Sequence, residues 1–174
     1  MSGGRLFWAV VLATLAVYAV MLGWSIPAIS DAAGGRAVFD MLPAGYSYAE
    51  AQAFLAALSP EGADFYRRVQ HRLDLIYPAL LAISTGWAMV RLAPRWRWRL
   101  ALLLAPIPGM VFDYLENRAV AAMLSAGADG LTLEMVAQAS RFSQLKAIFS
   151  TLSLGLLLVL ILAWAYRRWR ARAR

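Results

Sequence analysis

Four long apolar segments, separated by stretches that carry charged residues, dominate the pattern of this chain. Each segment has about the length that an α-helix needs to cross a hydrocarbon core of roughly 30 Å. They predict membrane-spanning helices at about residues 6–26, 74–91, 99–119 and 145–166. Because backbone polar groups in lipid must be satisfied within the protein, we expect an all-α integral membrane four-helix bundle in a single domain, residues 1–174.

The first apolar segment has a second interpretation. A short basic start followed by an alanine-rich apolar run is also typical of a cleaved signal peptide. The run between Arg5 and Pro27 is longer than a typical signal core, so we expect it to remain as the first span.

The stretch between the first two spans carries too many charges to enter lipid, and it predicts a small helical cap at about residues 46–72. Ser47 and Glu50 have the spacing of a capping box, which predicts that a short amphipathic helix begins here. Ser59 is a typical N-cap residue before Pro60. A second helix is therefore expected to begin at Pro60 and to run without a break into the second span.

Prolines, turn residues and small residues mark the later part of the chain. Pro106 and Pro108 are expected to bend the third span, and residues 127–130 predict a turn. Thr132 can cap a short helix that leads into the fourth span. The fourth span carries small residues that allow close helix contact: Ser150, Thr151, Ser153 and Gly155.

The amino-acid composition supports the membrane interpretation. Hydrophobic residues make up 61% of the chain and charged residues 16%, which is far from the balance of a soluble domain. The absence of cysteine excludes disulfides, thiolate metal sites and cysteine nucleophiles. The net charge of +7 comes mainly from arginines that flank apolar runs, so we expect membrane lipid and not nucleic acid as a partner.

The distribution of arginine predicts the orientation of the chain. The connection at residues 91–99 carries four arginines and no acid, and the tail after Tyr166 carries five arginines and no acid. The other two connections are mixed in charge. We expect the chain to lie in a bacterial inner (plasma) membrane. Because basic residues mark the cytoplasmic side, both termini are expected in the cytoplasm and the cap on the outer side.

Charged residues at membrane depth form the candidate functional site. On a helix, Asp113, Glu116 and Asn117 share one face. An ionisable side chain in this position is costly, so such a group is a candidate site by default.

Helix geometry places residues of three spans at one depth. At roughly 1.5 Å per residue, Asp74 and Glu116 each lie roughly 25 Å from the arginine connection at residues 91–99, and Lys146 lies roughly 31 Å from Arg167. We therefore expect these side chains to meet in the outer leaflet.

Pro78 adds a local feature to the second span. Proline has no N–H to donate to the carbonyl of Asp74, four residues earlier, so the backbone is opened beside a carboxylate. This opening is either part of a ligand pocket or a simple helix kink.

Two non-enzymatic interpretations of the cluster remain open. In the first, Lys146 neutralises one carboxylate and Asn117 satisfies another, which ties three spans together. In the second, the excess of carboxylates over lysine means that at least one of them holds a proton or binds a cation. Such a pocket could receive the head of a lipid, quinone or isoprenoid. A membrane-protein partner, with this chain as an accessory subunit, is a further possibility, for which exposed small residues on the fourth span would be evidence.

A metal-dependent membrane enzyme acting on a lipid head group is the alternative. Asp74, Asp113 and Glu116 could hold a divalent cation such as Mg²⁺ or Ca²⁺, with Asn117 as an oxygen ligand. His71, the only histidine, is either a general base or a solvated interfacial residue. No Gly-rich phosphate loop and no G-x-S-x-G elbow occurs, so the sequence names no catalytic residue.

Four short motifs carry a resemblance: E-G-x-x-x-Y at 61–66, L-D-x-x-Y-P at 73–78, D-x-x-E-N at 113–117 and Gln144-x-Lys146. Over about residues 60–160 the chain resembles a group of uncharacterised bacterial four-span inner-membrane proteins. The resemblance supplies no reaction. It implies that one site is formed by the polar residues of these motifs: Tyr66, Gln70, Asp74, Asp113, Glu116, Asn117 and Lys146.

Overall fold

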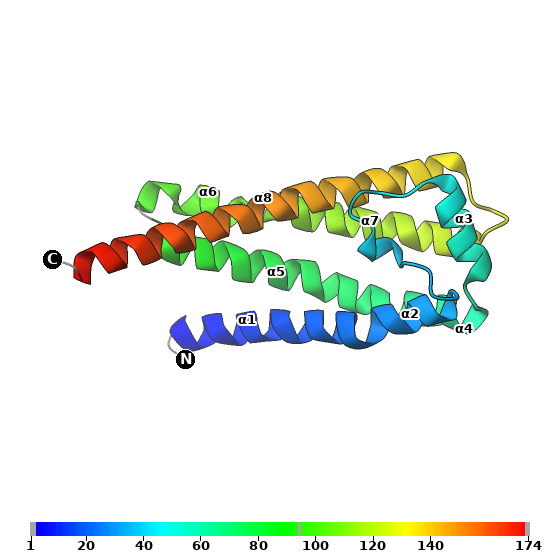
Figure 1. Cartoon of the computed structure of the whole chain (residues 1–174), viewed down its shortest axis with the longest axis horizontal. Coiled ribbons are helices and arrows are strands. Elements are labelled where there is room, and N and C mark those ends of the chain that lie inside the picture. Colours follow the sequence, from blue (N-terminus) through cyan, green and yellow to red (C-terminus); the bar gives the residue numbers. More distant parts are fainter. Residues whose placement is uncertain (1–2, 94, 173–174) are drawn as a thin grey trace.

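The computed structural model describes residues 3–93 and 95–172, and no strand occurs among them. Four helical rods in this part of the chain are long and apolar enough to cross a membrane, which confirms the predicted all-α bundle. The rods lie side by side, and a small helical cap covers one end (Figure 1). Pro94 of the arginine connection and the tail beyond residue 172 lie outside the described residues.

The first two rods each contain a π-helical turn. The first rod consists of α1 (Gly3–Val20), the turn η1 (Met21–Ser25) and α2 (Ile26–Ala32). The second consists of α4 (Pro60–Phe65), the turn η3 (Tyr66–Gln70) and α5 (His71–Leu92). As predicted, the second rod runs from Pro60 into the span without a break. Both π-helical turns lie near the cap and contact each other.

The third rod bends and the fourth is continuous. The third consists of the 3₁₀ turn η4 (Trp96–Trp98), α6 (Arg99–Leu104) and α7 (Ile107–Ala126). The break between α6 and α7 lies at Pro106, as predicted, because proline has no N–H for the helical ladder. After the turn at residues 127–130, Thr132 accepts a hydrogen bond from the Met135 N–H and α8 (Leu133–Arg172) follows without interruption.

Glycines allow two close helix contacts inside the bundle. A Cβ atom at Gly86 would lie 2.7 Å from the carbonyl oxygen of Leu103, and one at Gly109 would lie 2.9 Å from Ser150 Oγ. Space for such contacts is the reason for small residues in membrane helices. The prediction for the fourth span is therefore confirmed for Ser150, whereas Gly155 is exposed and faces open space.

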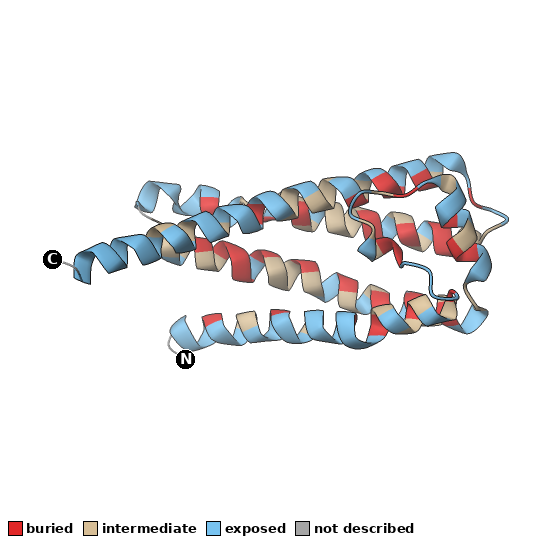
Figure 2. Ribbon diagram, viewed as in Figure 1, coloured by how far each residue is buried: buried red, intermediate tan, exposed pale blue. Residues whose placement is uncertain are grey.

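The largest apolar core lies at the capped end and not in the middle of the rods (Figure 2). Further along, the rods expose apolar side chains on their outer faces. This division follows from the solvent, because water drives burial in the cap while lipid accepts apolar surface along the spans. The core joins the cap to the ends of the rods through Ile29, Val38, Phe39, Phe54, Tyr66, Met123, Val136 and their neighbours.

The cap consists of a strap, which we define as residues 33–47, and helix α3 (Tyr48–Ala57). The strap contains the 3₁₀ turn η2 (Phe39–Met41) and folds back along the bundle (Figure 1). Its far end is attached to α8, because Tyr46 N–H donates to Ser140 Oγ at 2.9 Å and Gln144 Nε2 donates to the Ala44 carbonyl at 2.8 Å.

Both predicted helix caps are confirmed. Ser47 and Glu50 form a reciprocal capping box, and the two hydrogen bonds from Ser47 to the Glu50 carboxylate lower the pKa of that group. Ser59 Oγ accepts from the Gly62 N–H, with Pro60 in the first turn. The hydrogen bonds of Ser47 and Ser59 fix where α3 and α4 begin, and the start of α3 marks the end of the strap.

Gly45 provides a test of strap docking. Its φ is +85°, and a Cβ atom there would lie 2.5 Å from Ser140 Oγ and 2.6 Å from Gln144 Nε2. We expect Gly45→Ala to lower the free energy of unfolding by about 1–2 kcal/mol for the left-handed backbone and about 1–3 kcal/mol more for the clash. Chemical unfolding in detergent measures the change.

Gly34→Ala is the matched control, because φ at Gly34 is +66° but nothing lies within 4 Å of a Cβ atom there. This variant should show only the smaller backbone cost. Equal losses in the two variants would contradict the tight contact between the strap and α8.

Candidate functional site

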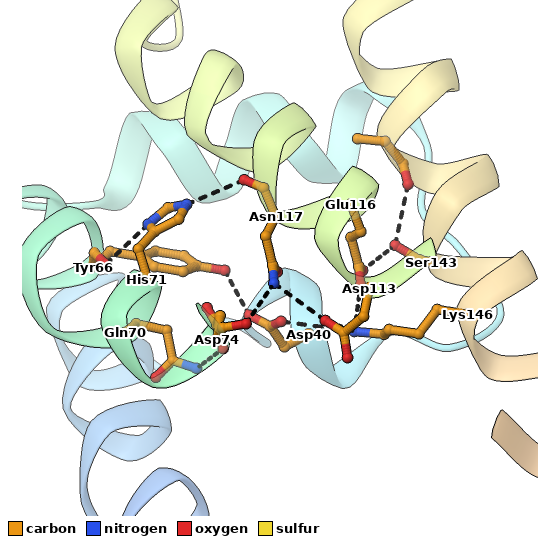
Figure 3. A network of polar contacts seen from close by, with 11 residues as sticks. Asp40, Tyr66, Gln70, His71, Asp74, Asp113, Glu116, Asn117, Ser143 and Lys146 are labelled. Atoms are coloured by element: carbon orange, nitrogen blue, oxygen red, sulfur yellow. Dashed lines mark hydrogen bonds and ion pairs between the residues drawn. The ribbon is translucent and has the colours of Figure 1, made fainter. Parts of the chain in front are cut away.

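A polar cluster lies where the strap meets α5, α7 and α8, just inside the capped end (Figure 3). The side chains come from elements far apart in the sequence and point toward one another. Apolar helices surround them, so each charge needs a partner within the protein.

Lys146 on α8 lies at the centre of the cluster. Its ammonium forms a close ion pair with Glu116 on α7, and the other oxygen of that carboxylate accepts a short hydrogen bond from Ser143 Oγ. Glu116 is almost completely buried. A buried carboxylate is tolerated only with such charged and hydrogen-bonding partners, so this pair connects α7 and α8.

Asp113 is the second acid beside Lys146. Its Oδ1 lies 3.9 Å from the ammonium and accepts a hydrogen bond from Asn117 Nδ2 at 3.2 Å. The same Nδ2 lies 3.4 Å from the backbone carbonyl oxygen of Asp74, which is the carbonyl that Pro78 leaves without its helical partner. Asn117 therefore fills the opening beside Pro78 as a hydrogen-bond donor.

Asp74 and Gln70 connect α5 to the first rod. Gln70 Nε2 donates to Asp74 Oδ1 at 2.8 Å, and Ser25 Oγ donates to Gln70 Oε1 at 2.6 Å. Ser25 and Gln70 belong to the two π-helical turns, η1 and η3. Such turns are rare and often occur at functional sites, because one extra residue in the turn redirects side chains. Here they turn both polar side chains into the bundle.

Asp40 belongs to the cluster and was missed by the sequence analysis. Its carboxylate accepts a hydrogen bond from the Tyr66 hydroxyl at 2.8 Å, and its Oδ1 lies 3.8 Å from Lys146 Nζ. The strap carries it there on η2. One signal was available: Asp40 is the only charged residue between positions 37 and 46.

His71 has a third role that neither sequence interpretation described. Its Nδ1 lies 3.2 Å from the Tyr66 carbonyl oxygen and its Nε2 lies 3.1 Å from the Asn117 carbonyl oxygen. Carbonyl oxygens only accept hydrogen bonds, so a neutral ring satisfies one of them and a doubly protonated ring satisfies both. His71 therefore bridges α5 and α7 through backbone groups, and its ring nitrogens do not face the carboxylates (Figure 3).

Tyr46 is the remaining polar group at the strap end of the cluster. Its hydroxyl is buried and has no hydrogen-bond partner in the described part of the chain. Burial, together with the negative charge of Glu116, raises the pKa of Tyr46. The phenol therefore stays neutral and adds no charge to the site.

A cavity of about 150 Å³ opens beside the carboxylates. Three of its lining residues are strongly exposed on the side of the bundle: Tyr18 at 44%, Leu22 at 40% and Met41 at 48%. The mouth therefore faces sideways between the first rod and the rest of the bundle. The wall combines charged and apolar side chains: Asp40, Asp74, Asp113 and Lys146, together with Tyr18, Met21, Leu22, Ile26, Met41 and Tyr77.

The divalent-cation site considered for Asp74, Asp113 and Glu116 has no matching geometry. Among residues 3–93 and 95–172, no group of three or more histidine, aspartate or glutamate side chains is arranged to hold a metal ion. Lys146 supplies the positive charge beside Glu116 and Asp113 instead. An ammonium in that position competes with a cation for the same oxygen atoms.

No protein-family model, curated protein or solved structure matches this chain. The grouping of residues therefore rests on contacts within the chain itself. Those contacts bring together the residues selected from the sequence: Tyr66, Gln70, Asp74, Asp113, Glu116, Asn117 and Lys146. They add Ser25, Asp40 and Ser143.

Replacing Lys146 tests how strongly the cluster depends on its ammonium. We expect Lys146→Met to lower the free energy of unfolding in detergent by about 3–5 kcal/mol, because Glu116 is left buried without a counter-charge. Adding Glu116→Gln should restore part of this loss, which a double-mutant cycle measures.

Arg68→Met is the control, since Arg68 pairs with Asp64 on an exposed surface. Removing such a pair changes stability by about 0–1 kcal/mol. If Lys146→Met cost no more than this control, the ion pair would not stabilise the bundle.

Proposed function

We propose that this protein is a membrane-embedded binding module for an amphiphilic molecule, whose polar head enters the cavity beside Asp40, Asp74 and Asp113. The observation that carries the proposal is the composition of the cavity wall, which combines charged side chains with apolar ones. Binding sites of small molecules have this combination of apolar surface with a few convergent polar groups.

The sideways mouth supports an amphiphile over a water-soluble ligand. Tyr18 and Leu22 lie on the first rod within its apolar span, and both are exposed on the outside of the bundle. α1 packs mainly against α5, while α8 packs mainly against α7, so the first rod stands apart from α8 (Figure 1). A ligand at this mouth can keep its hydrocarbon part in the lipid beside α1.

The size of the cavity limits what enters it. Sites for whole drug-sized ligands usually have roughly 300–1,000 Å³, whereas a cavity of roughly 150 Å³ is known to hold a molecule as small as benzene. The volume of about 150 Å³ is therefore suited to a head group alone. The rest of the ligand would lie outside the protein.

A purely structural network explains part of the cluster but not all of it. Lys146, Glu116 and Ser143 are closely paired and need no ligand. Asp74 instead forms no ion pair among the described residues and faces an open volume. A side chain whose only task was to lock the helices would be expected to have its charge balanced.

The proposal also includes the membrane in which the chain lies and the orientation of the chain across it. The motifs shared with bacterial four-span inner-membrane proteins and the arginine-rich ends support an inner-membrane location with both termini in the cytoplasm. The cap would then lie outside the membrane and the mouth of the cavity in the outer half of the membrane. A role as accessory subunit is the second candidate, favoured by Thr151 and Gly155, which are exposed one turn apart on α8.

Native mass spectrometry of gently extracted protein tests the binding proposal. We expect a co-purifying amphiphile on the wild type and on Asp64→Asn, a control at an exposed carboxylate. Asp113→Asn should lose most of this adduct, because the amide removes a charge from the cavity wall without changing its shape. If Asp113→Asn lowered only the thermal stability and kept the adduct, the site would be structural; a co-purifying protein would support the accessory-subunit role instead.

Reporter fusions test the orientation. A cytoplasm-dependent reporter after Arg174, which lies beyond the described residues, should be active, because arginine-rich segments remain on the cytoplasmic side. A fusion within the strap, after Gly35, should instead activate a periplasm-dependent reporter. The opposite pattern would overturn the assignment of the cap to the outside.

A further inference from the structure

The charges around the cavity do not balance. Asp40, Asp74 and Asp113 line it, and Lys146 supplies the one ammonium in the wall. That ammonium is closely paired with Glu116 and lies 3.8 and 3.9 Å from the nearest oxygens of Asp40 and Asp113. One positive charge therefore serves four carboxyl groups, and in an apolar environment the carboxylates beyond that one need either a proton or a further positive charge.

Asp74 shows where the missing positive charge would bind. The residue is 4% exposed and its Oδ1 accepts from Gln70, but no ion pair or second hydrogen bond to its carboxylate occurs in the described part of the chain. The other carboxylate oxygen, Oδ2, is not fully enclosed by the protein, and Asp74 lines the cavity. This oxygen is thus available to a donor that enters the cavity.

The cavity wall also contains two aromatic rings, which suit a cation. Tyr18 on α1 and Tyr77 on α5 stack with ring centroids 5.5 Å apart and an interplanar angle of 17°, and both line the cavity. The faces of aromatic rings attract ammonium groups, most strongly away from water. An ammonium in the cavity would therefore lie among carboxylates and aromatic rings.

We propose that the head group bound in this cavity is an ammonium group carried on an apolar chain. The inference rests on the proposed function and specifies its ligand. A primary ammonium has three N–H donors, which matches the three carboxylates that line the cavity. A neutral head would bring no positive charge to these carboxylates, and an anionic head would add a further negative charge.

A water-soluble amine would also supply an ammonium group. The mouth lies among exposed side chains with apolar surface, namely those of Tyr18, Leu22 and Met41. A long chain adds apolar contact there, at roughly 0.8 kcal/mol for each buried methylene group, and a short soluble amine does not. A membrane amphiphile is therefore the expected source of the ammonium.

The test compares ligands that share one chain and differ in the head. The full-length protein in a neutral detergent is titrated with dodecylammonium, dodecyltrimethylammonium, dodecanol and dodecanoate, and binding is followed by native mass spectrometry. We expect at least one of the two ammonium compounds to bind about tenfold or more tightly than dodecanol, and dodecanoate to bind more weakly than dodecanol, as charge-assisted contacts require. Ethylammonium is the short-chain comparison and should bind weakly.

The possible outcomes separate this inference from the proposed function. Equal binding of the ammonium compounds and dodecanol would overturn the ammonium preference while leaving amphiphile binding intact. No binding of any long-chain compound would overturn both, and tight binding of ethylammonium would replace the membrane amphiphile with a soluble amine. These comparisons use the wild type alone, so they do not depend on a variant that folds.

Two substitutions then locate the site. Asp74→Asn should reduce the preference for the ammonium compound over dodecanol to about twofold or less, because it removes the unpaired charge and keeps the side-chain shape. Asp64→Asn, at an exposed position outside the cavity, should leave the preference unchanged. An unchanged preference in folded Asp74→Asn would place ammonium binding elsewhere.

Discussion

The ammonium of Lys146 is the interaction on which the rest of the structure depends. It holds Glu116 in a close ion pair and lies within 4 Å of Asp40 and Asp113, so α7, α8 and the strap meet at one atom. In a membrane, helices are not forced together by the hydrophobic effect, because lipid accepts apolar surface as readily as another helix does. A buried charge with partners on different elements fixes their relative positions, since each partner left alone would be strongly unfavourable.

Two solvents shape the two ends of the molecule differently. At the capped end, where Phe39, Phe54 and Tyr66 pack in the core, water drives the burial of apolar side chains. Along the spans, close approach depends on small residues such as Gly86 and Gly109, and the outer surfaces remain apolar. The polar cluster lies at the border between the capped end and the spans. There the strap is held by the core and can carry Asp40 into the bundle.

The cavity follows from the same arrangement. The first rod packs mainly against α5 and stands apart from α8, and Ser25 and Gln70 on the π-helical turns η1 and η3 bond to each other between the first two rods. The cluster thus has a closed part around Glu116 and an open part around Asp74. The closed part stabilises the bundle, whereas the open part keeps a charged wall accessible from the side of the membrane. This separation allows one polar cluster to serve both packing and binding.

The sequence by itself determined the spans, the capping box of Ser47 and the common depth of Asp74, Glu116 and Lys146, because hydrophobic period, cap chemistry and helical rise are local properties. It did not determine the place of Asp40, because a strap without regular structure has no rise from which a position can be calculated. Nor did it show that Asn117 binds the Asp74 carbonyl left free by Pro78, since that contact depends on how α5 and α7 are rotated against each other. Only the tertiary structure decided these contacts and the cavity, because they arise from the packing of whole helices.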